Sequence, residues 1–313
     1  MSFSPNKFIT EKTRELKDKI GDHRAIIATS GGVDSVVCAI LAKRVLEKNS
    51  VVLFLDNGLM REGEAAEVKS FFDKMGTNIE IWDVEIKERF FEALKGKRDP
   101  EEKRIAFRDT FYKTLGQAVK SYSVDFLIQG TIATDIIETQ KGIKTQHNVL
   151  SQIGVNPSTF GLKVIEPLKE LYKPQVREVA KKLGLPNKFA ERKPFPGPGL
   201  ATRIIGEVVP ERVEKIRKAT QIVEDIITGK SVFQVLAVLL SDKATGMVGG
   251  KRVLGDIIAI RAVESKDART ANPSKLPWAT LFKVRDKILK EVPGVVKVVY
   301  DITPKPPSTI EYI

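Results

Sequence analysis

The chain has 313 residues, and its 52 lysines and arginines against 40 aspartates and glutamates give it a formal net charge of +12. With 42% hydrophobic and 29% charged residues it is globular in composition, and it is too apolar for a disordered protein. The length predicts two domains of ordinary size. A single cysteine excludes an intrachain disulfide framework, a cysteine-rich zinc site and a two-cysteine redox mechanism, and two histidines argue against a histidine-rich metal site.

No apolar run approaches the ~18 residues of a membrane span, and the first residues lack the apolar core of a signal peptide. We therefore expect a cytoplasmic protein with no membrane partner. The positive charge is evenly divided, because residues 1–199 hold 33 basic and 27 acidic groups and residues 200–313 hold 19 and 13, so that each part carries +6. This distribution fits phosphate-bearing substrates or an acidic partner at least as well as a nucleic-acid groove.

The first part of the chain alternates short apolar strands with helices. Strands are expected at residues 24–28, 51–55, 79–84, 124–129 and 163–166. Helices are expected at residues 33–47, 62–75, 100–122 and 173–183. The strands are continuous apolar runs, as in a parallel sheet buried on both faces. The alternation predicts an α/β fold with a doubly wound parallel sheet and a ligand beyond the carboxyl ends of its strands.

Residues 193–200 read KPFPGPGL, and three prolines and two glycines in eight residues exclude a helix interior or a central strand. We place a domain boundary here, between residues 1–192 and 193–313. The second part has another rhythm and predicts a smaller α+β domain. Its expected helices are at residues 210–228 and 278–291, its strands at 232–240, 253–263 and 295–302, and a glycine-rich turn at 246–250.

The string SGGVDS, residues 30–35, follows the first expected strand and opens the first expected helix. Gly31 and Gly32 allow the backbone N–H groups to converge on one anion, and the helix N-terminus adds partial positive charge. The hydroxyls of Ser30 and Ser35 are further donors, and Asp34 is a candidate magnesium ligand. A helix cap without a ligand is the plainer alternative, but the complete string at a first strand–helix junction favours a phosphate site.

The patterns G-x-x-x-x-G-K-[ST] and G-x-G-x-x-G are both absent. The string instead resembles the pyrophosphate loop of the N-type ATP pyrophosphatases, which have an adenine-nucleotide-hydrolase-like fold. These enzymes cleave ATP between the α and β phosphates and activate a carbonyl oxygen by adenylation. The resemblance therefore implies ATP as a co-substrate and Mg²⁺ as a cofactor.

Further strings narrow the resemblance within that group. They are LDNGLMR at 55–61, DPEEKR at 99–104, QGTI at 129–132, DIIE at 135–138, HNV at 147–149, IEPL at 165–168, PFPGPGL at 194–200, IRAVE at 260–264 and VYDI…KPPSTIE at 299–311. Together they resemble the synthetase part of the GMP synthetase family, from about residue 2 to the C-terminus. The family adenylates xanthosine monophosphate (XMP) at O2, releases pyrophosphate, and aminates the adduct with ammonia to give GMP and AMP, as a carbon–nitrogen ligase of purine biosynthesis.

The resemblance also implies the roles of particular residues. The ATP site would consist of Thr29, Ser30, Gly31, Gly32, Val33, Asp34, Ser35, Asp56, Asn57, Gly130 and Thr131, with Asp34, Ser35 and Ser30 taking part in catalysis. Magnesium ligands would be Asp34 and Asp135. The XMP site would consist of Arg104, Arg252, Lys305 and Glu311. The resemblance also implies that residues 193–313 form a dimerisation and XMP-binding domain.

Several of these residues also have plainer interpretations. Arg104 lies in a charged helix, where most arginines only face solvent, and Asp-Asn-Gly after a strand is often just a turn. The chain departs from the family at Gln146-His147, where paired histidines are common, and at Ala106-Phe107-Arg108, which bears on the contact expected of Arg104. Residues 132–160 are poorly patterned and are expected to form a mobile lid.

The source of ammonia follows from the cysteine count. A class I glutaminase needs a nucleophilic cysteine in a G-x-C-x-G elbow, whereas Cys38 lies within an apolar helix and is expected to be a packing residue. We therefore expect a separate glutamine amidotransferase subunit to supply ammonia to a homodimer of this chain, with free ammonium able to replace it.

Two related enzymes and one other class of protein remain as alternatives. An NAD synthetase would share the pyrophosphate loop, but PFPGPGL and the C-terminal domain argue against it. A tRNA thiolase would give the +12 charge a partner, yet such enzymes generally pass sulfur through cysteine pairs. A non-catalytic nucleotide-binding module would not need the loop, Asp34, Asp135 and the tail cations together. With two phosphate-bearing nucleotides to account for the charge, we expect no nucleic-acid partner.

Overall fold

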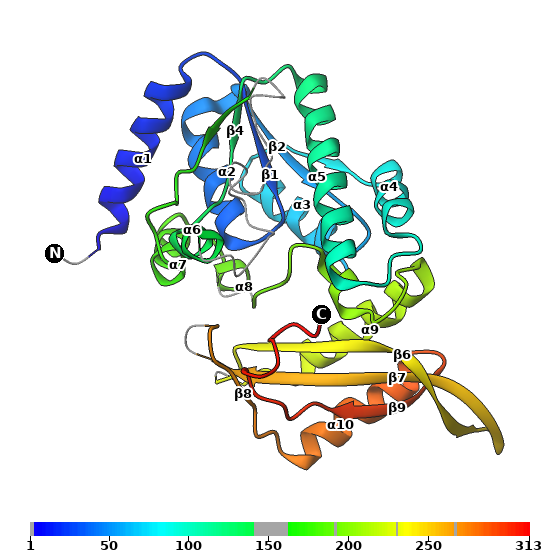
Figure 1. Ribbon diagram of the computed structural model, residues 1–313. Coiled ribbons are helices and arrows are strands. Elements are labelled where there is room, and N and C mark those ends of the chain that lie inside the picture. The colour runs from blue at the N-terminus through cyan, green and yellow to red at the C-terminus, as the bar shows by residue number, and fades with distance from the viewer. Residues whose placement is uncertain (1–2, 141–161, 191–192, 230, 266–267) are drawn as a thin grey trace. The chain divides into compact units, whose positions relative to one another are not determined.

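The computed structural model describes residues 3–140, 162–190, 193–229, 231–265 and 268–313 (Figure 1). The chain divides into two compact units that are described separately below. Unit 1 consists of Met1–Asn57, Glu64–Lys87 and Asp109–Arg192, and unit 2 consists of Gly58–Gly63, Glu88–Arg108 and Lys193–Ile313. Two short segments from the first 192 residues thus belong to the compact body formed by the last 121. The assignment of one substrate to residues 1–192 and the other to 193–313 stays a prediction.

Unit 1 is built on a five-stranded parallel sheet in the order β3-β2-β1-β4-β5. Its strands are β1 (Ala25–Thr29), β2 (Ser50–Leu55), β3 (Ile79–Trp82), β4 (Phe126–Ile128) and β5 (Lys163–Ile165). Ala25 of the central β1 is in register with Ser50 on one side and with Phe126 on the other. The strand order changes direction on either side of β1, which confirms the doubly wound α/β fold.

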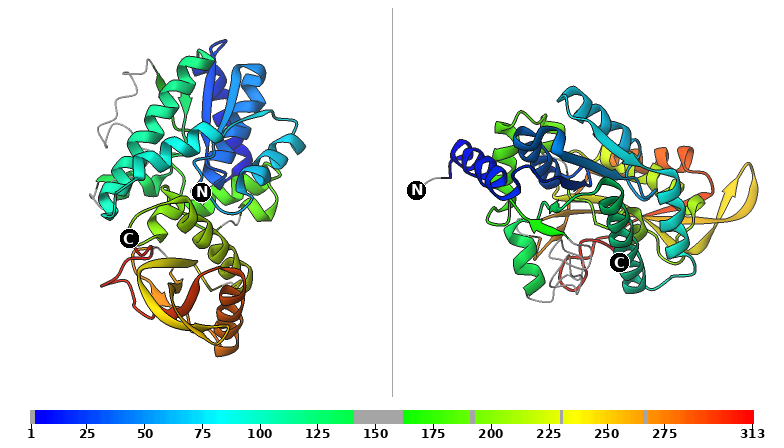
Figure 2. Two further views of the ribbon diagram at one scale, coloured as in Figure 1. Left: turned by 90° about the vertical axis from the view of Figure 1, so that its right-hand side faces the viewer. Right: turned by 90° about the horizontal axis from the view of Figure 1, so that it is seen from above.

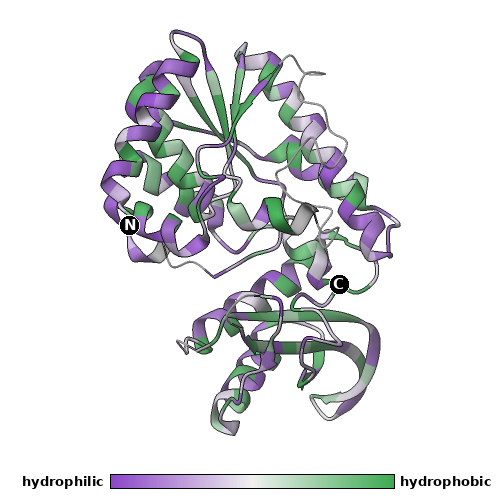
Figure 3. Ribbon diagram, turned by 60° about the vertical axis from the view of Figure 1, so that its left-hand side comes forward, coloured by the Kyte–Doolittle hydropathy of each residue, from purple (hydrophilic) through white to green (hydrophobic). Residues whose placement is uncertain are grey.

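Helices cover both faces of this sheet, because alternate residues of each strand point to opposite sides. On one face Ile26, Leu53 and Leu127 form a core with Leu115 and Val119 of α5 (Pro100–Tyr122). Helix α2 (Val33–Leu46) packs against β1 and β2 and buries nine of its residues. Figure 2 shows α5 (green) and α2 (blue) on opposite sides of the strands, and Figure 3 shows those strands as a green, apolar band between them.

The other helices complete unit 1 or join the two units in sequence. They are α1 (Pro5–Ile20), α3 (Glu64–Lys74), α4 (Val84–Leu94), α6 (Ala133–Gln140), α7 (Lys173–Lys182) and α8 (Asn187–Ala190). The sequence patterns did not predict α1 or α4, and α6 occupies the first part of the expected lid. The remaining lid residues, 141–160, lie outside the described residues. Among the helices that the structure describes, none is both long enough and apolar enough to cross a membrane.

Unit 2 contains a mixed sheet in which a long antiparallel hairpin is the main feature. Strands β6 (Gln234–Val248) and β7 (Lys251–Glu264) form the hairpin, β8 (Asn272–Pro273) pairs with β7, and β9 (Val295–Tyr300) runs parallel to β7. Helix α9 (Pro210–Ile226) packs along β6, and α10 (Trp278–Glu291) packs along β9. The 3-10 helix η4 (Gly199–Arg203) precedes α9 in the chain. The predicted elements are all present, but both hairpin strands extend beyond their expected ends to form an arm (Figure 1).

Candidate nucleotide-binding site

The loop between β1 and α2 brings the hydroxyls of Thr29, Ser30 and Ser35 together. Ser35 Oγ lies 3.0 Å from Thr29 Oγ1, accepts the Ser30 N–H at 3.2 Å and donates to the Gly32 carbonyl at 3.1 Å. Gly31 has a φ of +74°, a left-handed conformation that favours glycine, and its N–H donates to Thr29 Oγ1 at 3.2 Å. The loop leads into the N-terminus of α2, whose free N–H groups and dipole favour an anion.

Gly130 explains why the loop and the end of β4 can lie so close together. A Cβ atom at position 130 would come within 2.9 Å of Ser35 N and 3.0 Å of the Asp34 carbonyl carbon. These are backbone atoms of the loop, so a side chain here would displace it. The structure thus brings Gly130 into direct contact with the predicted phosphate-binding residues.

Asp34 is held in the first turn of α2 by a residue that the sequence did not reveal. Lys173, at the start of α7, donates from Nζ to Asp34 Oδ2 at 2.6 Å across a sequence separation of 139 residues. The other carboxylate oxygen, Oδ1, is buried with no hydrogen-bond partner among the described residues. Burial raises the pKa of Asp34, the negative charge of Asp135 adds to that rise, and Lys173 opposes it.

Several predicted site residues follow the other strands of unit 1, at the carboxyl-terminal edge of the sheet. Thr131 is buried and donates from Oγ1 to Glu166 Oε1 at 2.7 Å. Asp56, after β2, forms an ion pair with Lys87 at 3.0 Å, and Asn57 is buried. Asp135 accepts the Ile132 N–H at 3.0 Å. Because the carboxyl ends of parallel strands meet at one sheet edge, these residues belong to the edge that binds ligands in doubly wound folds.

The oxygen atoms near Asp34 suit a magnesium ion that a nucleotide helps to hold. Mg²⁺ usually keeps several waters and takes one or two protein carboxylates together with substrate phosphates. Asp34 Oδ1 is a buried acceptor without a partner in the described structure, and Asp135 is near enough to affect the pKa of Asp34. The described ranges contain no group of three or more metal-binding side chains, so an all-protein metal cage is not part of them.

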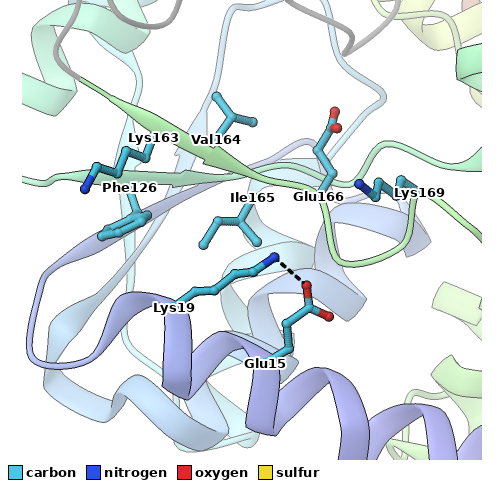
Figure 4. A pocket seen from close by; sticks show the side chains of 8 residues that line it. All are labelled: Glu15, Lys19, Phe126, Lys163, Val164, Ile165, Glu166 and Lys169. Atoms are coloured by element: carbon cyan, nitrogen blue, oxygen red, sulfur yellow. Dashed lines mark hydrogen bonds and ion pairs between the residues drawn. The ribbon is translucent and has the colours of Figure 1, made fainter.

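A cavity of about 290 Å³ lies elsewhere in unit 1, between α1 and the edge strand β5 (Figure 4). Its charged lining includes Lys19, which bonds Glu15 at 2.7 Å, and Glu166, which also accepts the hydrogen bond from Thr131. None of the eight lining residues belongs to the 29–35 loop, and none is a predicted site residue. The predicted phosphate site in the 29–35 loop and this cavity therefore have no lining residue in common.

Cys38 has the packing role that the sequence predicted. Its side chain is fully buried in α2, with Sγ 3.5 Å from the Gln129 carbonyl. Burial raises the pKa of the Cys38 thiol well above its usual value, and the negative charges of Asp34 and Glu166 add to the rise. A buried, protonated thiol does not supply a glutaminase nucleophile.

The four residues predicted to bind the second nucleotide all lie in unit 2. Arg104 is on α5 and bonds Glu101 at 3.3 Å, and Arg252 is exposed on the hairpin arm. Lys305 donates from Nζ to the Ala268 carbonyl at 2.9 Å, and Glu311 pairs with the buried Arg203 at 3.2 Å. Sequence patterns did not reveal Arg203, because its partner is 108 residues away.

The tail that carries Lys305 and Glu311 is fixed to β7 by a second buried arginine. Arg261 donates to the carbonyl oxygens of Thr303, Thr309 and Ile310 at 2.8–3.1 Å and pairs with Asp301 at 2.7 Å. The IRAVE string, 260–264, and the tail string thus contact each other in the structure. The remaining predicted feature, Gln146-His147, lies outside the described residues.

Arg252 and Glu311 are far apart within one chain. Glu311 contacts Gln234 at the start of β6, which pairs with Val263 of β7, whereas Arg252 lies near the hairpin turn, 11 residues from Val263 along β7. At about 3.3 Å per residue this separation along β7 is roughly 36 Å, which exceeds the length of a nucleotide. We therefore expect that one bound nucleotide does not contact both residues of the same chain.

Comparison with known proteins identifies the class of the chain. The PP-loop domain family matches residues 5–189, and the GMP synthase C terminal domain family matches residues 221–312. The fold, the 29–35 loop and these matches make the chain a PP-loop protein with an attached GMP synthase C-terminal domain.

Full-length relatives define the family more narrowly. The chain is 50% identical over 307 residues to the B subunit of the glutamine-hydrolyzing GMP synthase of Archaeoglobus fulgidus, covering 98% of both chains. It is 46% identical over 318 residues to the corresponding protein of Methanopyrus kandleri, covering 99% of both, and 50% identical over 309 residues to that of Methanocella arvoryzae, covering 98% of both. The chain belongs to the family of GMP synthase B subunits.

Proposed function

We propose that the chain is the synthetase subunit of a two-subunit GMP synthase, a ligase that converts XMP to GMP at the expense of ATP. The observation that carries the proposal is the presence, in one chain, of the phosphate loop on β1–α2 and the GMP synthase C-terminal domain, with full-length relatives bearing that name. ATP is the co-substrate that PP-loop enzymes of this family use. We place this step of purine nucleotide synthesis in the cytoplasm.

In the first step the XMP O2 atom attacks the α-phosphorus of ATP, and the bond to the β-phosphate breaks. The backbone N–H groups of residues 30–35 and the hydroxyls of Thr29, Ser30 and Ser35 would bind the departing pyrophosphate at the N-terminus of α2, in exchange for their hydrogen bonds within the loop. Magnesium bound at Asp34 and Asp135 would spread the negative charge of the phosphates. Gly130 and Thr131, with Asp56 and Asn57, would contact the rest of the nucleotide.

In the second step ammonia attacks C2 of the adenylated base, AMP leaves, and the added nitrogen loses a proton. AMP is a far better leaving group than a hydroxide-like oxygen, which is the reason for using ATP. Arg104 and Lys305 would bind the XMP phosphate as cations, and Glu311 would accept a hydrogen bond from the sugar or the base. These assignments rest on the family's sequence strings and on the presence of all three residues in unit 2.

Ammonia would come from a separate glutamine amidotransferase subunit. The relatives are named as the B subunit of a glutamine-hydrolyzing enzyme, and the buried Cys38 offers no nucleophile for glutamine. Free ammonium should therefore replace the partner in vitro.

We also propose that the chain acts as a homodimer. The supporting observation is the separation of roughly 36 Å along the hairpin between Arg252 and the residues that contact Glu311, since a site that uses both needs two copies of the chain. Residues 193–313 would then provide both the dimer contact and most of the XMP site.

The test is to incubate the chain with Mg-ATP and ammonium and with one acceptor at a time. XMP should give GMP and AMP in equal amounts, while deamido-NAD and unmodified tRNA should give no AMP. Replacing ammonium with glutamine in the absence of a partner is the matched control and should give no GMP. Formation of ADP, or AMP formation that does not depend on the acceptor, would exclude the proposed reaction.

A further inference from the structure

The side chain of Glu311 is held by two buried residues that neither the motifs nor the family strings single out. Arg203 Nε lies 3.3 Å from Glu311 Oε2 and Arg203 Nη2 lies 3.2 Å from Oε1, so the guanidinium grips both carboxylate oxygens. Gln234 Nε2 donates a short hydrogen bond to the same Oε1. The three residues come from η4, the start of β6 and the C-terminal tail, which are distant in sequence.

The burial of this cluster sets Glu311 apart from its partners. The side chain of Arg203 is fully buried and Gln234 is 4% exposed, whereas the side chain of Glu311 retains 22% of its exposure. A carboxylate offers about four acceptor positions, and three are used by Arg203 and Gln234. One acceptor position of Glu311 therefore remains for a donor from outside the cluster.

Arg203 is itself held in place by Phe195 and by the buried helix η4. Its guanidinium lies over the ring of Phe195 at 4.5 Å, and it belongs to η4, whose residues Gly199–Arg203 are all buried. A buried charge without a partner is costly, so Arg203 and Glu311 fix each other's position. A planar guanidinium fork also fixes the plane of the carboxylate, which a lysine would not do.

We propose that Arg203 and Gln234 are positioning residues that hold the Glu311 carboxylate in one orientation, with its free acceptor position presented to an O–H or N–H donor of the acceptor nucleotide. The inference rests on the proposed role of Glu311 in binding XMP, and it explains how Glu311 is held in a fixed orientation. A glutamate on an unattached tail would lose side-chain entropy when it binds a ligand. Glu311 is already ordered by Arg203 and Gln234, so this entropy cost is smaller.

The test measures the KM for XMP and for ATP, with ammonium as nitrogen donor, in Arg203→Lys and Gln234→Met. Each substitution keeps the approximate size of the side chain and removes one or more hydrogen bonds to a charged group. We expect the KM for XMP to rise about tenfold or more in each, with the KM for ATP changed by less than about twofold. If Arg203→Lys does not fold, as judged by its thermal unfolding, Gln234→Met decides the question alone.

Arg61→Lys is the matched control. Arg61 also lies over the Phe195 ring, at 4.1 Å, but pairs with Glu224 at 2.9 Å and makes no contact with Glu311 among those described. It should leave both KM values unchanged, so a rise specific to Arg203→Lys reports the contact with Glu311 and not the packing around Phe195.

Glu311→Ala separates failure of this inference from failure of the proposed XMP site. If Glu311→Ala raises the KM for XMP but Arg203→Lys and Gln234→Met do not, the positioning role is wrong and the XMP site stands. If Glu311→Ala leaves the KM for XMP unchanged, Glu311 does not bind XMP, and both the positioning role and the proposed XMP site are wrong. The KM for XMP of the double variant Arg203→Lys/Glu311→Ala should be no higher than that of Glu311→Ala alone.

Repeating the comparison with 2′-deoxy-XMP and 3′-deoxy-XMP identifies the donor that Glu311 binds. Loss of a ribose hydroxyl removes the effect of Glu311→Ala on KM only if Glu311 binds that hydroxyl.

Discussion

Asp34 combines a short ion pair with an unsatisfied buried oxygen. Lys173 satisfies Oδ2 at 2.6 Å, while Oδ1 has no partner in the described structure. Buried polar groups without a partner are rare in folded proteins, and a ligand site is one explanation for them. Asp34 was predictable because it lies within a contiguous string, but Lys173 was not, because no local pattern connects α7 with the loop.

We predict that Asp34→Asn lowers the rate of XMP-dependent pyrophosphate release by at least about a hundredfold, the usual effect of losing one electrostatic group at a reacting centre. The raised pKa of Asp34 reflects the cost of burying its ionised carboxylate. The amide removes that cost, and Lys173, which is 37% exposed, can be rehydrated. The thermal unfolding midpoint should therefore not fall.

Calorimetry and a pyrophosphate assay on the same preparation check this prediction. Ser50→Ala, which changes an intermediate-exposure residue at the start of β2, serves as a control for substitution in unit 1. Wild-type turnover by Asp34→Asn would remove Asp34 from the reaction.

Lys103, on helix α5, is a buried lysine that links this helix to another segment of unit 2. Its side chain is completely buried, and Nζ donates to the Ile204 carbonyl at 2.6 Å. Burial lowers the pKa of Lys103 from 10.5 to about 8, the positive charge of Arg212 adds to that effect, and Asp99 opposes it. The start of α5 is thus attached to the segment after η4 by a buried lysine side chain.

The lowered pKa predicts the direction of a pH effect. Between pH 8 and 10.5 the unfolded chain binds more protons at Lys103 than the folded chain, so the contribution of Lys103 to the free energy of unfolding increases as the pH rises. We expect the wild type to gain about 1–2 kcal/mol relative to Lys103→Met between pH 7.5 and 9.5.

Urea unfolding of both proteins at the two pH values measures that difference. Lys113→Met, at an exposed position of the same helix, should show the same pH dependence as the wild type. A parallel pH dependence in wild type and Lys103→Met would mean that the Lys103 pKa is not lowered.

All five strands of the parallel sheet were predictable because each is a continuous apolar run. Helices α5 and α10 also have the predicted bounds, and each begins at or directly after a proline, Pro100 and Pro277. Helix α1 was missed because only Phe8, Leu16 and Ile20 are buried among many charged residues. Strand β6 was predicted to end at residue 240 because the residues beyond it, such as Lys243 and Thr245, form an exposed arm without an apolar run.

For the whole molecule, the length of the hairpin bears on the number of chains in a working enzyme. The arm carries exposed Met247, Val248 and Leu254 next to Arg252. The sequence strings that predicted Arg252 and Glu311 as site residues could not show that the two residues are separated by the length of a strand. Only the register of β6 with β7 gives that separation.

We predict that two inactive variants restore each other's activity. In a homodimer whose sites each combine Arg252 of one copy with Glu311 of the other, a mixed dimer of Arg252→Ala and Glu311→Ala has one intact site and one doubly altered site. Random assembly from equal amounts should recover about a quarter of wild-type activity in the mixture, and the isolated mixed dimer should show about half.

Co-expression with two different affinity tags and sequential purification isolates the mixed dimer, and GMP formation from XMP and ammonium is the readout. Co-expression of Glu311→Ala with itself under both tags is the control and should stay inactive. Absence of recovery in the mixed dimer would show that Arg252 and Glu311 do not act across two chains.

The internal bonding of the 29–35 loop has a consequence for product release. The Ser35 hydroxyl is already engaged with Thr29 and the Gly32 carbonyl, and the Gly31 N–H with Thr29 Oγ1. A phosphate that binds these groups exchanges existing bonds for new ones, so the net gain per bond is small. If the loop binds pyrophosphate as proposed, we expect it to retain the product weakly once the bond to the α-phosphate is broken, which favours turnover over inhibition by the product.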